Sequence, residues 1–425
     1  MKRKLLLVVS CLMVALLVLV ACNGDDGDSD EIVLRIGWWG GDSRHERTYE
    51  VIELFEERHP GIRIEAYYAP WGDYWTMLTT MAAADNLPDI IQMDMTRINE
   101  FDGNDLLLDL APFINSGAID LSHVDNAYQE ILQDGARTLG ISLGANAFAL
   151  IYNRDLANEH GISFDPGYTY DEMLANFLVM RATIGDHFMG FDFSDASYEV
   201  FNMFVRQFGQ PFYGDGALGF DEDILVQFFE MMHNMIEDGT GFPESLRVQL
   251  NTAGEAYTNH NIIAGIGASN QIVGRSGETE YELGLALLPR VASGSHSGHW
   301  LRSSMQFSIT SGTEVSDAAA KFIDFFTNDI EANLILEAER GVPISSEIRN
   351  ALIDIVPAPV AEQFTFLDVV AANASAVDAL PPEGATQFRD AFQRISEFVM
   401  AGVTTPADAA QQFMNEAASI FAQMQ

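Results

Sequence analysis

The sequence predicts a mixed α/β protein of two lobes, the first of them built on a mainly parallel sheet. Strand-like apolar segments alternate with helix-like segments over residues 32–94, which is typical of a parallel sheet covered by helices. The chain has 425 residues, 48% of them hydrophobic, and this is more than one ordinary domain needs for its core. A second apolar, glycine-containing segment at residues 140–152 indicates a strand that crosses into a second lobe.

The first lobe is expected to begin as a βαβαβ unit. Strands are predicted at residues 32–37, 62–66 and 90–94, and the second helix at residues 73–84. Asp42 and Ser43 are candidate caps for the first helix, which ends at His59-Pro60-Gly61 because proline and glycine stop it.

The second half of the chain adds strands and a helical tail. Buried strands are expected at residues 261–267 and 283–288, and an extended segment at residues 305–309. Helices are predicted at residues 317–326 and 330–339, and the tail is helical from about Pro357.

The charge of the chain restricts the partners it can have. Asp and Glu number 62 against 22 Lys and Arg, a formal charge of −40, which repels phosphate backbones and anionic lipid headgroups. Nucleic-acid binding is therefore not expected. The two cysteines, Cys11 and Cys22, leave no thiol in the body of the chain for a disulfide or a metal site.

The N-terminus has the pattern of an export signal. Lys2-Arg3-Lys4 precedes an apolar run that ends in Leu19-Val20-Ala21-Cys22, which resembles a bacterial lipobox. We expect residues 1–21 to be a lipoprotein signal peptide, Cys22 to be lipidated and residues 22–30 to be a flexible acidic tether. The alternative is an uncleaved membrane anchor. Either reading places the body outside, at the outer face of the bacterial cytoplasmic membrane.

Several motifs along the mature chain resemble one known family. They are Ile36-Gly37-Trp38-Trp39-Gly40-Gly41-Asp42, His59-Pro60-Gly61-Ile62, Ala84-Asp85-Asn86-Leu87-Pro88-Asp89-Ile90, Gly144-Ala145-Asn146 before Leu150-Ile151-Tyr152-Asn153, and Ala319-Ala320-Lys321-Phe322 before Gly341-Val342-Pro343. The chain resembles the family 1 extracellular solute-binding proteins of carbohydrate ABC transporters.

This resemblance implies a periplasmic-binding-protein-like fold of type II, with the ligand in a cleft between two lobes. It implies one lobe from residues 31–144 and 305–355, and another from residues 145–304 and 356–425. The implied function is capture of an oligosaccharide by lobe closure and delivery to membrane permease subunits, by a monomer without catalysis, cofactor or metal.

The side chains that suit a sugar site gather near the predicted strand ends. Sugars offer apolar faces to aromatic rings and hydroxyls to planar polar groups, and open α/β sheets bind ligands at strand ends. The candidate platforms are Trp38, Trp39, Trp71 and Trp300, with core packing as the alternative, whereas Trp75 inside a helix is expected to be core. The candidate hydroxyl ligands are Asp42, which has capping as its alternative, His45, Tyr74 and Asp94.

The resemblance adds Asn146, Asn270, Trp300 and Arg302 as cleft-lining residues in the second lobe. Many relatives carry an aromatic residue near the position of Asn270, and this chain does not. A guanidinium at Arg302 could pair with a carboxylate, which would favour uronate-containing oligosaccharides. A salt bridge to one of the many acidic residues is the alternative interpretation.

Two other function classes are alternatives for this sequence. A glycoside hydrolase needs two carboxylates at a defined separation, which 62 acidic residues make uninformative in sequence. A surface adhesin or a sensor-type sugar-binding lipoprotein is compatible with a lipid anchor. His296 and His299 have ligand-like spacing, yet they lie in a Gly/Ser-rich segment without an acidic or cysteine partner, so a solvated loop is expected there.

Overall fold

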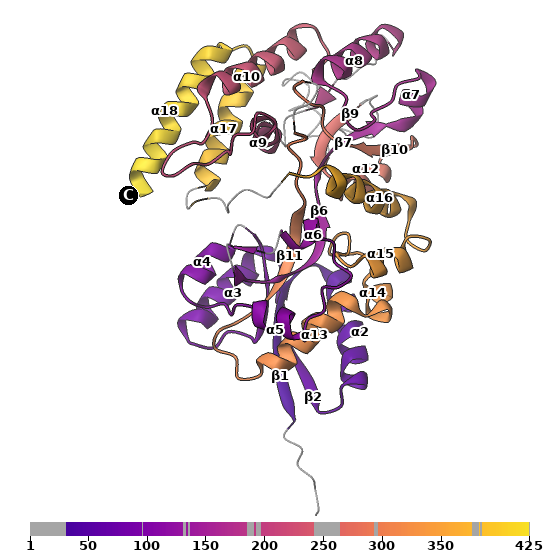
Figure 1. The fold of residues 1–425 in the computed structure, drawn as a ribbon, viewed down its shortest axis with the longest axis vertical. Helices are drawn as coiled ribbons and strands as arrows, with labels where there is room; N and C mark the ends of the chain where they lie inside the picture. The colour runs from indigo at the N-terminus through magenta and orange to yellow at the C-terminus, as the bar shows by residue number, and fades with distance from the viewer. Residues whose placement is uncertain are drawn as a thin grey trace, which may run out of the picture.

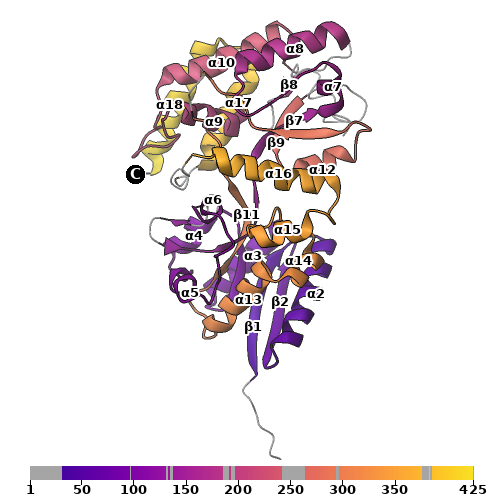
Figure 2. The same cartoon turned by 45° about the vertical axis from the view of Figure 1, so that its right-hand side comes forward.

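The fold consists of two α/β lobes, stacked along the long axis of the molecule (Figures 1 and 2). The computed structural model describes residues 31–95, 97–130, 133–134, 137–184, 191–192, 197–241, 264–292, 296–375, 382 and 385–424. The predicted signal peptide (1–21), the lipidation site Cys22 and the predicted tether (22–30) lie outside the described residues. The α/β class predicted from sequence is confirmed.

A five-stranded sheet forms the centre of the first lobe. Its order is β2-β1-β3-β11-β6, with bounds Ile62–Ala69, Ile32–Trp39, Ile90–Met93, Arg302–Ile309 and Ile141–Asn146. β1 is parallel to β2 and β3, whereas β11 is antiparallel to both β3 and β6. The expectation of a mainly parallel sheet is therefore corrected to a mixed sheet, because β11 belongs to a late segment of the chain that runs against the βαβαβ unit.

The second lobe holds a smaller sheet of order β10-β7-β9-β8. Its strands are Leu283–Ala286, Phe148–Asn153, Ala264–Ala268 and Phe191–Asp192, and a separate pair is formed by β4 (Gln133–Asp134) and β5 (Arg137–Thr138). The apolar segment at residues 140–152 becomes two strands, β6 and β7, on either side of Ala147. It crosses from one sheet to the other, as its sequence predicts.

Helices cover both sheets. The first lobe carries α2 (Asp42–Arg58), α3 (Trp71–Ala83), α4 (Ile98–Gly103), α5 (Ala111–Ser116), α6 (Asn126–Glu130), α13 (Ser316–Asn328), α14 (Ile330–Leu336) and α15 (Ser346–Leu352). The second carries α7 (Arg154–Glu159), α8 (Tyr170–Ile184), α9 (Ser197–Gln207), α10 (Glu222–Glu237), α12 (Gln271–Ser276), α16 (Ala358–Asn373), α17 (Ala385–Met400) and α18 (Pro406–Met424). The cap of α2 is Gly41, without a side-chain hydrogen bond. Asp42 is the first helical residue instead of the predicted cap.

Aromatic packing dominates both cores. In the first lobe the ring centroids of Phe55 and Phe322 lie 5.0 Å apart, and in the second Phe201 stacks on Phe392 at 5.0 Å. All four side chains are fully buried, and each contributes about 1.5 to 3 kcal/mol of hydrophobic free energy. The apolar core of the first lobe continues along the crossing strands to Leu367 on α16, so one apolar network joins the lobes.

The crossing is packed backbone against backbone. Ala145 and Val342 exchange two hydrogen bonds, of 2.7 and 3.1 Å, where the segment after α14 passes β6. Gly144 lies at the contact, and a Cβ atom there would come within 2.5 Å of the Arg340 carbonyl oxygen. Gly341 has φ of 111°, a conformation that favours glycine. The two glycines therefore allow this close approach at the hinge.

Replacing Gly144 by alanine is expected to destabilise the protein by about 1 to 3 kcal/mol, because the added methyl group overlaps backbone atoms that cannot rotate away. Urea denaturation of the mature chain measures this change. Gly274→Ala is the matched control: an added Cβ at this α12 position meets no atom within 4 Å, and the change should leave stability unchanged or raise it by up to about 1 kcal/mol. A Gly144→Ala variant as stable as the wild type would contradict the packing described here.

Candidate functional site

A cavity of about 430 Å³ lies between the lobes. Its wall on the first lobe comes from the start of α2 and the segment after α14, its floor from the crossing strands β6 and β11, and its wall on the second lobe from α12 and α16. The lining residues include Ser43, Arg44, Arg47, Asn146, Asn270, Val273, Ser304, Met305, Glu337, Glu339, Arg340, Val360 and Gln363. Of the residues predicted for the site, the cavity brings together Asn146 and Asn270.

The floor of the cavity includes two polar residues, Asn146 and Ser304. The Asn146 Oδ1 atom is buried with no hydrogen-bond partner in the described part of the chain. Ser304, beside it, donates its hydroxyl to the carbonyl oxygens of Gly144 (2.8 Å) and Arg340. A buried amide oxygen without a partner costs about 1 to 3 kcal/mol. A ligand hydroxyl that donates to Asn146 would remove this cost.

Three arginines form the first-lobe wall. Arg44 donates through Nε to both carboxylate oxygens of Glu339, at 2.9 Å each, and Arg47 pairs with Glu337 at 2.8 Å. Arg340 is buried and donates to Gln92 Oε1 at 3.1 Å and to Thr48 Oγ1 at 2.8 Å. Burial lowers the pKa of Arg340 to about 9, so the guanidinium stays charged at neutral pH. These contacts hold the segment after α14 against α2.

The predicted aromatic platforms separate into exposed and buried rings. Trp71 begins α3 and is 48% exposed, and its ring meets Trp39 edge-on with centroids 4.9 Å apart. Trp39 is 8% exposed and packs also on Trp75, which is core as expected. Trp39 lies in β1 and Trp71 in a helix, not in the loops that the sequence indicates. Trp71 therefore has a ring that is about half exposed and that packs on the buried ring of Trp39.

Trp38 and Tyr74 are fully buried. Trp38 lies in β1 and donates Nε1–H to His45 Nδ1 at 3.0 Å, and Tyr74 donates its hydroxyl to the carbonyl oxygens of Gly37 and Gln92. A ring without exposed surface cannot contact a sugar, so the expectation of ligand contact is corrected for these two residues. His45 is half-buried with its Nδ1 occupied as an acceptor, and burial lowers its pKa.

The two acidic candidates lie at the same edge of the sheet. Asp42 is exposed in the first turn of α2, and Asp94 directly follows β3 and is half-buried. Asn270, on the opposite lobe, is exposed at the start of α12 and makes no side-chain cap hydrogen bond. These groups are accessible to a ligand from both lobes.

Trp300 and Arg302 lie where the chain returns from the second lobe into β11. The guanidinium of Arg206 covers the Trp300 ring at 4.9 Å, and that of Arg302 covers the Phe148 ring at the same distance. Near them Arg389 pairs with Glu199 at 2.7 Å. Sequence reasoning missed Phe148, Glu199, Arg206 and Arg389. Only Phe148 carried a usable signal, because it lies two positions after Asn146 and so faces the same side of an extended segment.

His299 is buried and not in a solvated loop, which corrects the expectation from sequence. The Leu288 amide donates to its Nε2 at 3.0 Å, and Nδ1 lies 3.2 Å from the Ser297 carbonyl oxygen, an arrangement that fits a neutral ring protonated on Nδ1. Burial lowers its pKa to about 4. His296 is exposed. Among the residues that the structure describes, no three His, Cys, Asp or Glu side chains gather as they would to hold a metal.

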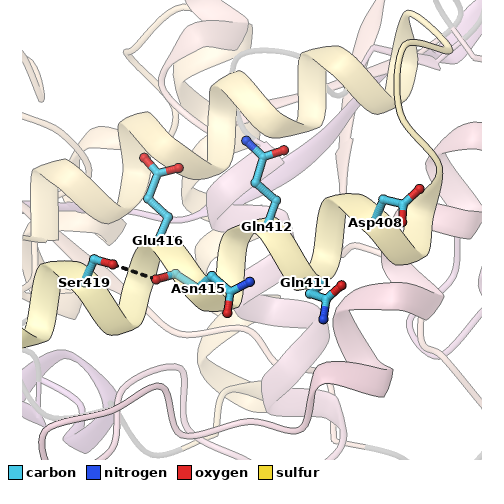
Figure 3. A pocket seen from close by; sticks show the side chains of 6 residues that line it. All are labelled: Asp408, Gln411, Gln412, Asn415, Glu416 and Ser419. Carbon is cyan, nitrogen blue, oxygen red and sulfur yellow. Dashed lines mark hydrogen bonds between the residues drawn. The ribbon is translucent and has the colours of Figure 1, made fainter.

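A second hollow lies on α18 and is shown in Figure 3. Asp408, Gln411, Gln412, Asn415, Glu416 and Ser419 line it, all from this one helix. The Ser419 hydroxyl donates to the Asn415 backbone carbonyl oxygen at 3.0 Å. A row of polar side chains along one exposed helix face is ordinary surface, so the cavity between the lobes is the better candidate site.

The fold and its interlobe cavity define a two-lobed solute-binding protein. Residues 41–332 match the model of the bacterial extracellular solute-binding protein family, and the chain belongs to this family. Its members bind solutes outside the cytoplasm. In the described part of the chain no helix has both the length and the apolar character needed to cross a membrane.

Solved structures and a curated relative are similar to the chain. A family 1 extracellular solute-binding protein from Alicyclobacillus acidocaldarius is 26% identical with a TM-score of 0.81, covering 92% of this chain and 98% of that one. A periplasmic oligogalacturonide binding protein from Yersinia enterocolitica is 21% identical with a TM-score of 0.78, covering 92% and 99%. A binding protein of Brucella abortus is 23% identical over 305 residues, 70% of this chain and 72% of the relative. The predicted family and two-lobed fold are confirmed.

The buried His299 is expected to make stability depend on pH. Its pKa of about 4 in the folded protein lies below the 6.5 of the unfolded chain, so below pH 6.5 the unfolded chain takes up a proton that the folded protein does not. Stability should therefore fall by about 2 to 3 kcal/mol as the pH drops from above 6.5 to about 4.5.

Urea denaturation at several pH values, compared between the wild type and His299→Gln, isolates this contribution. The variant should lose that part of the pH dependence, whereas His296→Gln, at an exposed position, should keep it. Equal pH dependence in the wild type and His299→Gln would contradict the assignment.

Proposed function

We propose that this protein captures an oligosaccharide outside the cell and delivers it to the permease of an ABC importer. The observation that carries the proposal is the cavity between the lobes, with the unpartnered Asn146 oxygen on its floor and ligand-accessible groups on both walls. Sugar hydroxyls donate and accept hydrogen bonds at every ring, so they suit a site that offers both amide and guanidinium groups. The Yersinia protein named above, an oligogalacturonide binding protein, has the same fold.

Affinity in this proposal has two sources. The exposed Trp71 ring, and the half-buried Trp300 ring, each contribute about 1.5 to 3 kcal/mol when a sugar face covers them. Hydrogen bonds to groups such as Asn146, Asn270, Asp42 and Asp94 add about 0.5 to 1.5 kcal/mol each. A few contacts of each kind reach micromolar affinity after ordering costs are subtracted.

Lobe closure gives the signal for transport. A ligand that contacts Asn146 on the floor, α2 on one side and α12 on the other stabilises a closed arrangement over an open one, by the difference in its affinity for the two. The permease would then recognise the closed pair of lobes. The proposal also includes lipid anchoring of a monomer through Cys22 at the outer face of the cytoplasmic membrane.

A tryptophan-fluorescence titration of residues 23–425 against neutral and acidic oligosaccharides tests the proposal, with product analysis of each mixture afterwards. Saturable change without turnover supports it, because Trp71 is exposed and Trp300 is half-buried, so a bound ligand can alter their fluorescence. Cleaved sugar would instead indicate a hydrolase. A folded protein that responds to none of the sugars would overturn the carbohydrate assignment.

Asn146→Ala is expected to weaken oligosaccharide binding about 3- to 10-fold through loss of one hydrogen bond, without lowering thermal stability, since the amide oxygen has no partner among the described residues. Isothermal titration calorimetry and a melting curve measure the two effects. The control is Asn415→Ala, on the exposed face of α18 (Figure 3), which should change neither. If Asn146→Ala melts well below the wild type and binds sugar normally, the residue is structural.

Trp71→Ala should weaken binding at least about 10-fold by removing a stacking face, while the fold is retained because about half of the ring is already in water. Phe398→Ala is its control, since Phe398 is an aromatic residue of similar exposure on α17. Titration of both variants with the same sugar measures their affinities for comparison. Equal affinity in the two variants would remove Trp71 from the site.

A further inference from the structure

The Arg302 guanidinium lies near two carboxylates, Glu199 and Asp94, but forms an ion pair with neither. Its side chain is half-buried at the start of β11, and its guanidinium rests on the Phe148 ring at 4.9 Å. Within the described residues it makes no hydrogen bond and no ion pair. Burial of a charged group without such partners costs free energy. An anionic group of a ligand at this position would reduce that cost.

Arg302 and the cavity floor lie on one face. Arg302 is paired directly with Asn146 across the antiparallel strands β11 and β6, and directly opposed residues in such a ladder project to the same side. Asn146 and Ser304 both line the cavity. A guanidinium with free N–H groups therefore stands next to an amide oxygen with no partner, at the hinge between the lobes.

The charged groups around Arg302 do not neutralise it. Burial lowers the pKa of Arg302, and Arg389 acts in the same direction. Glu199 and, more weakly, Asp94 oppose this, but Glu199 is itself paired with Arg389 at 2.7 Å. Arg44, Arg47 and Arg340 line the cavity that contains Asn146, together with Glu337 and Glu339. The chain as a whole has a formal charge of −40, whereas the lining of this cavity has more arginines than carboxylates.

We propose that the ligand is an acidic oligosaccharide, and that Arg302 binds the carboxylate of a uronic acid unit while Asn146 accepts a hydrogen bond from a hydroxyl of the same or the next ring. The inference rests on the proposed function and names its substrate class. A carboxylate matches the planar fork of a guanidinium, which donates two parallel hydrogen bonds to it. The Phe148 ring keeps the fork oriented through its face.

The experiment compares each acidic oligosaccharide with its own methyl ester, which keeps the ring and removes the charge. Di- and trigalacturonic acid, glucuronic acid-containing disaccharides and their esters are titrated into residues 23–425 by calorimetry. The wild type should bind an acid at least about 10-fold more tightly than its ester. Arg302→Gln should lose about 10- to 100-fold for the acid and little for the ester, so that the preference disappears.

Two further variants make the result specific. Arg302→Lys keeps the charge but not the fork, and should recover only part of the preference. Arg394→Gln removes the same charge from the exposed ion pair of Arg394 with Glu416 and should leave the preference intact. Melting curves verify that each variant is folded. If Arg302→Gln does not fold, Arg302→Lys and the acid-to-ester ratio of the wild type decide the proposal.

The outcomes separate this inference from the function it rests on. Esters or neutral oligosaccharides that bind as tightly as the acids, or an Arg302→Gln variant that weakens both equally, would overturn the acidic ligand and leave an oligosaccharide receptor in place. If Arg302→Gln weakens the binding of acid and ester equally, Arg302 serves lobe closure and not carboxylate recognition. A folded wild type that binds neither acids nor esters would overturn both.

Discussion

The antiparallel ladder between β6 and β11 is the constraint on which the rest of the structure depends. Both strands continue from one lobe into the other. Their hydrogen bonds hold the two crossing segments of the chain side by side. Close packing at Gly144 adds a third crossing segment through the bonds between Ala145 and Val342. Because buried backbone groups must be paired, this ladder gives the cavity a floor of hydrogen-bonded backbone between its two walls.

The walls of the cavity show how an acidic protein can keep a cationic interior. Arg44 and Arg47 are matched by Glu339 and Glu337, and Arg340 donates to Gln92 and Thr48 and lies 3.5 Å from the Glu339 carboxylate. These pairs bind the segment after α14 to α2. Such partly buried pairs are screened less by salt than the surface charges that surround them, so the field inside the cavity is set locally and not by the net charge of the chain.

The tryptophans of the first lobe differ in how much of their surface is exposed. Trp38 points into the layer under α2 and Trp39 into the layer under α3, because successive residues of a strand project to opposite faces. Both are closed off by neighbours, Trp38 by Tyr68 and His45 and Trp39 by Trp71 and Trp75. Of Trp39, Trp71 and Trp75, only Trp71 keeps a large exposed face, and Tyr68 keeps one beside Trp38. Buried rings therefore support exposed rings near these strand ends.

The sequence by itself determined the fold class, most strands and helices, and the crossing segment at residues 140–152, because these follow from local periodicity and from turn residues such as Pro60 and Gly61. Resemblance in short motifs carried the family and the candidates Asn146, Asn270, Trp300 and Arg302. Only the tertiary structure decided that Trp38 and Tyr74 are buried, that His299 is core, and that β11 makes the first sheet mixed. Burial and strand direction depend on contacts between segments more than a hundred residues apart, such as the pairing of Arg302 with Asn146, and local patterns carry no information on them.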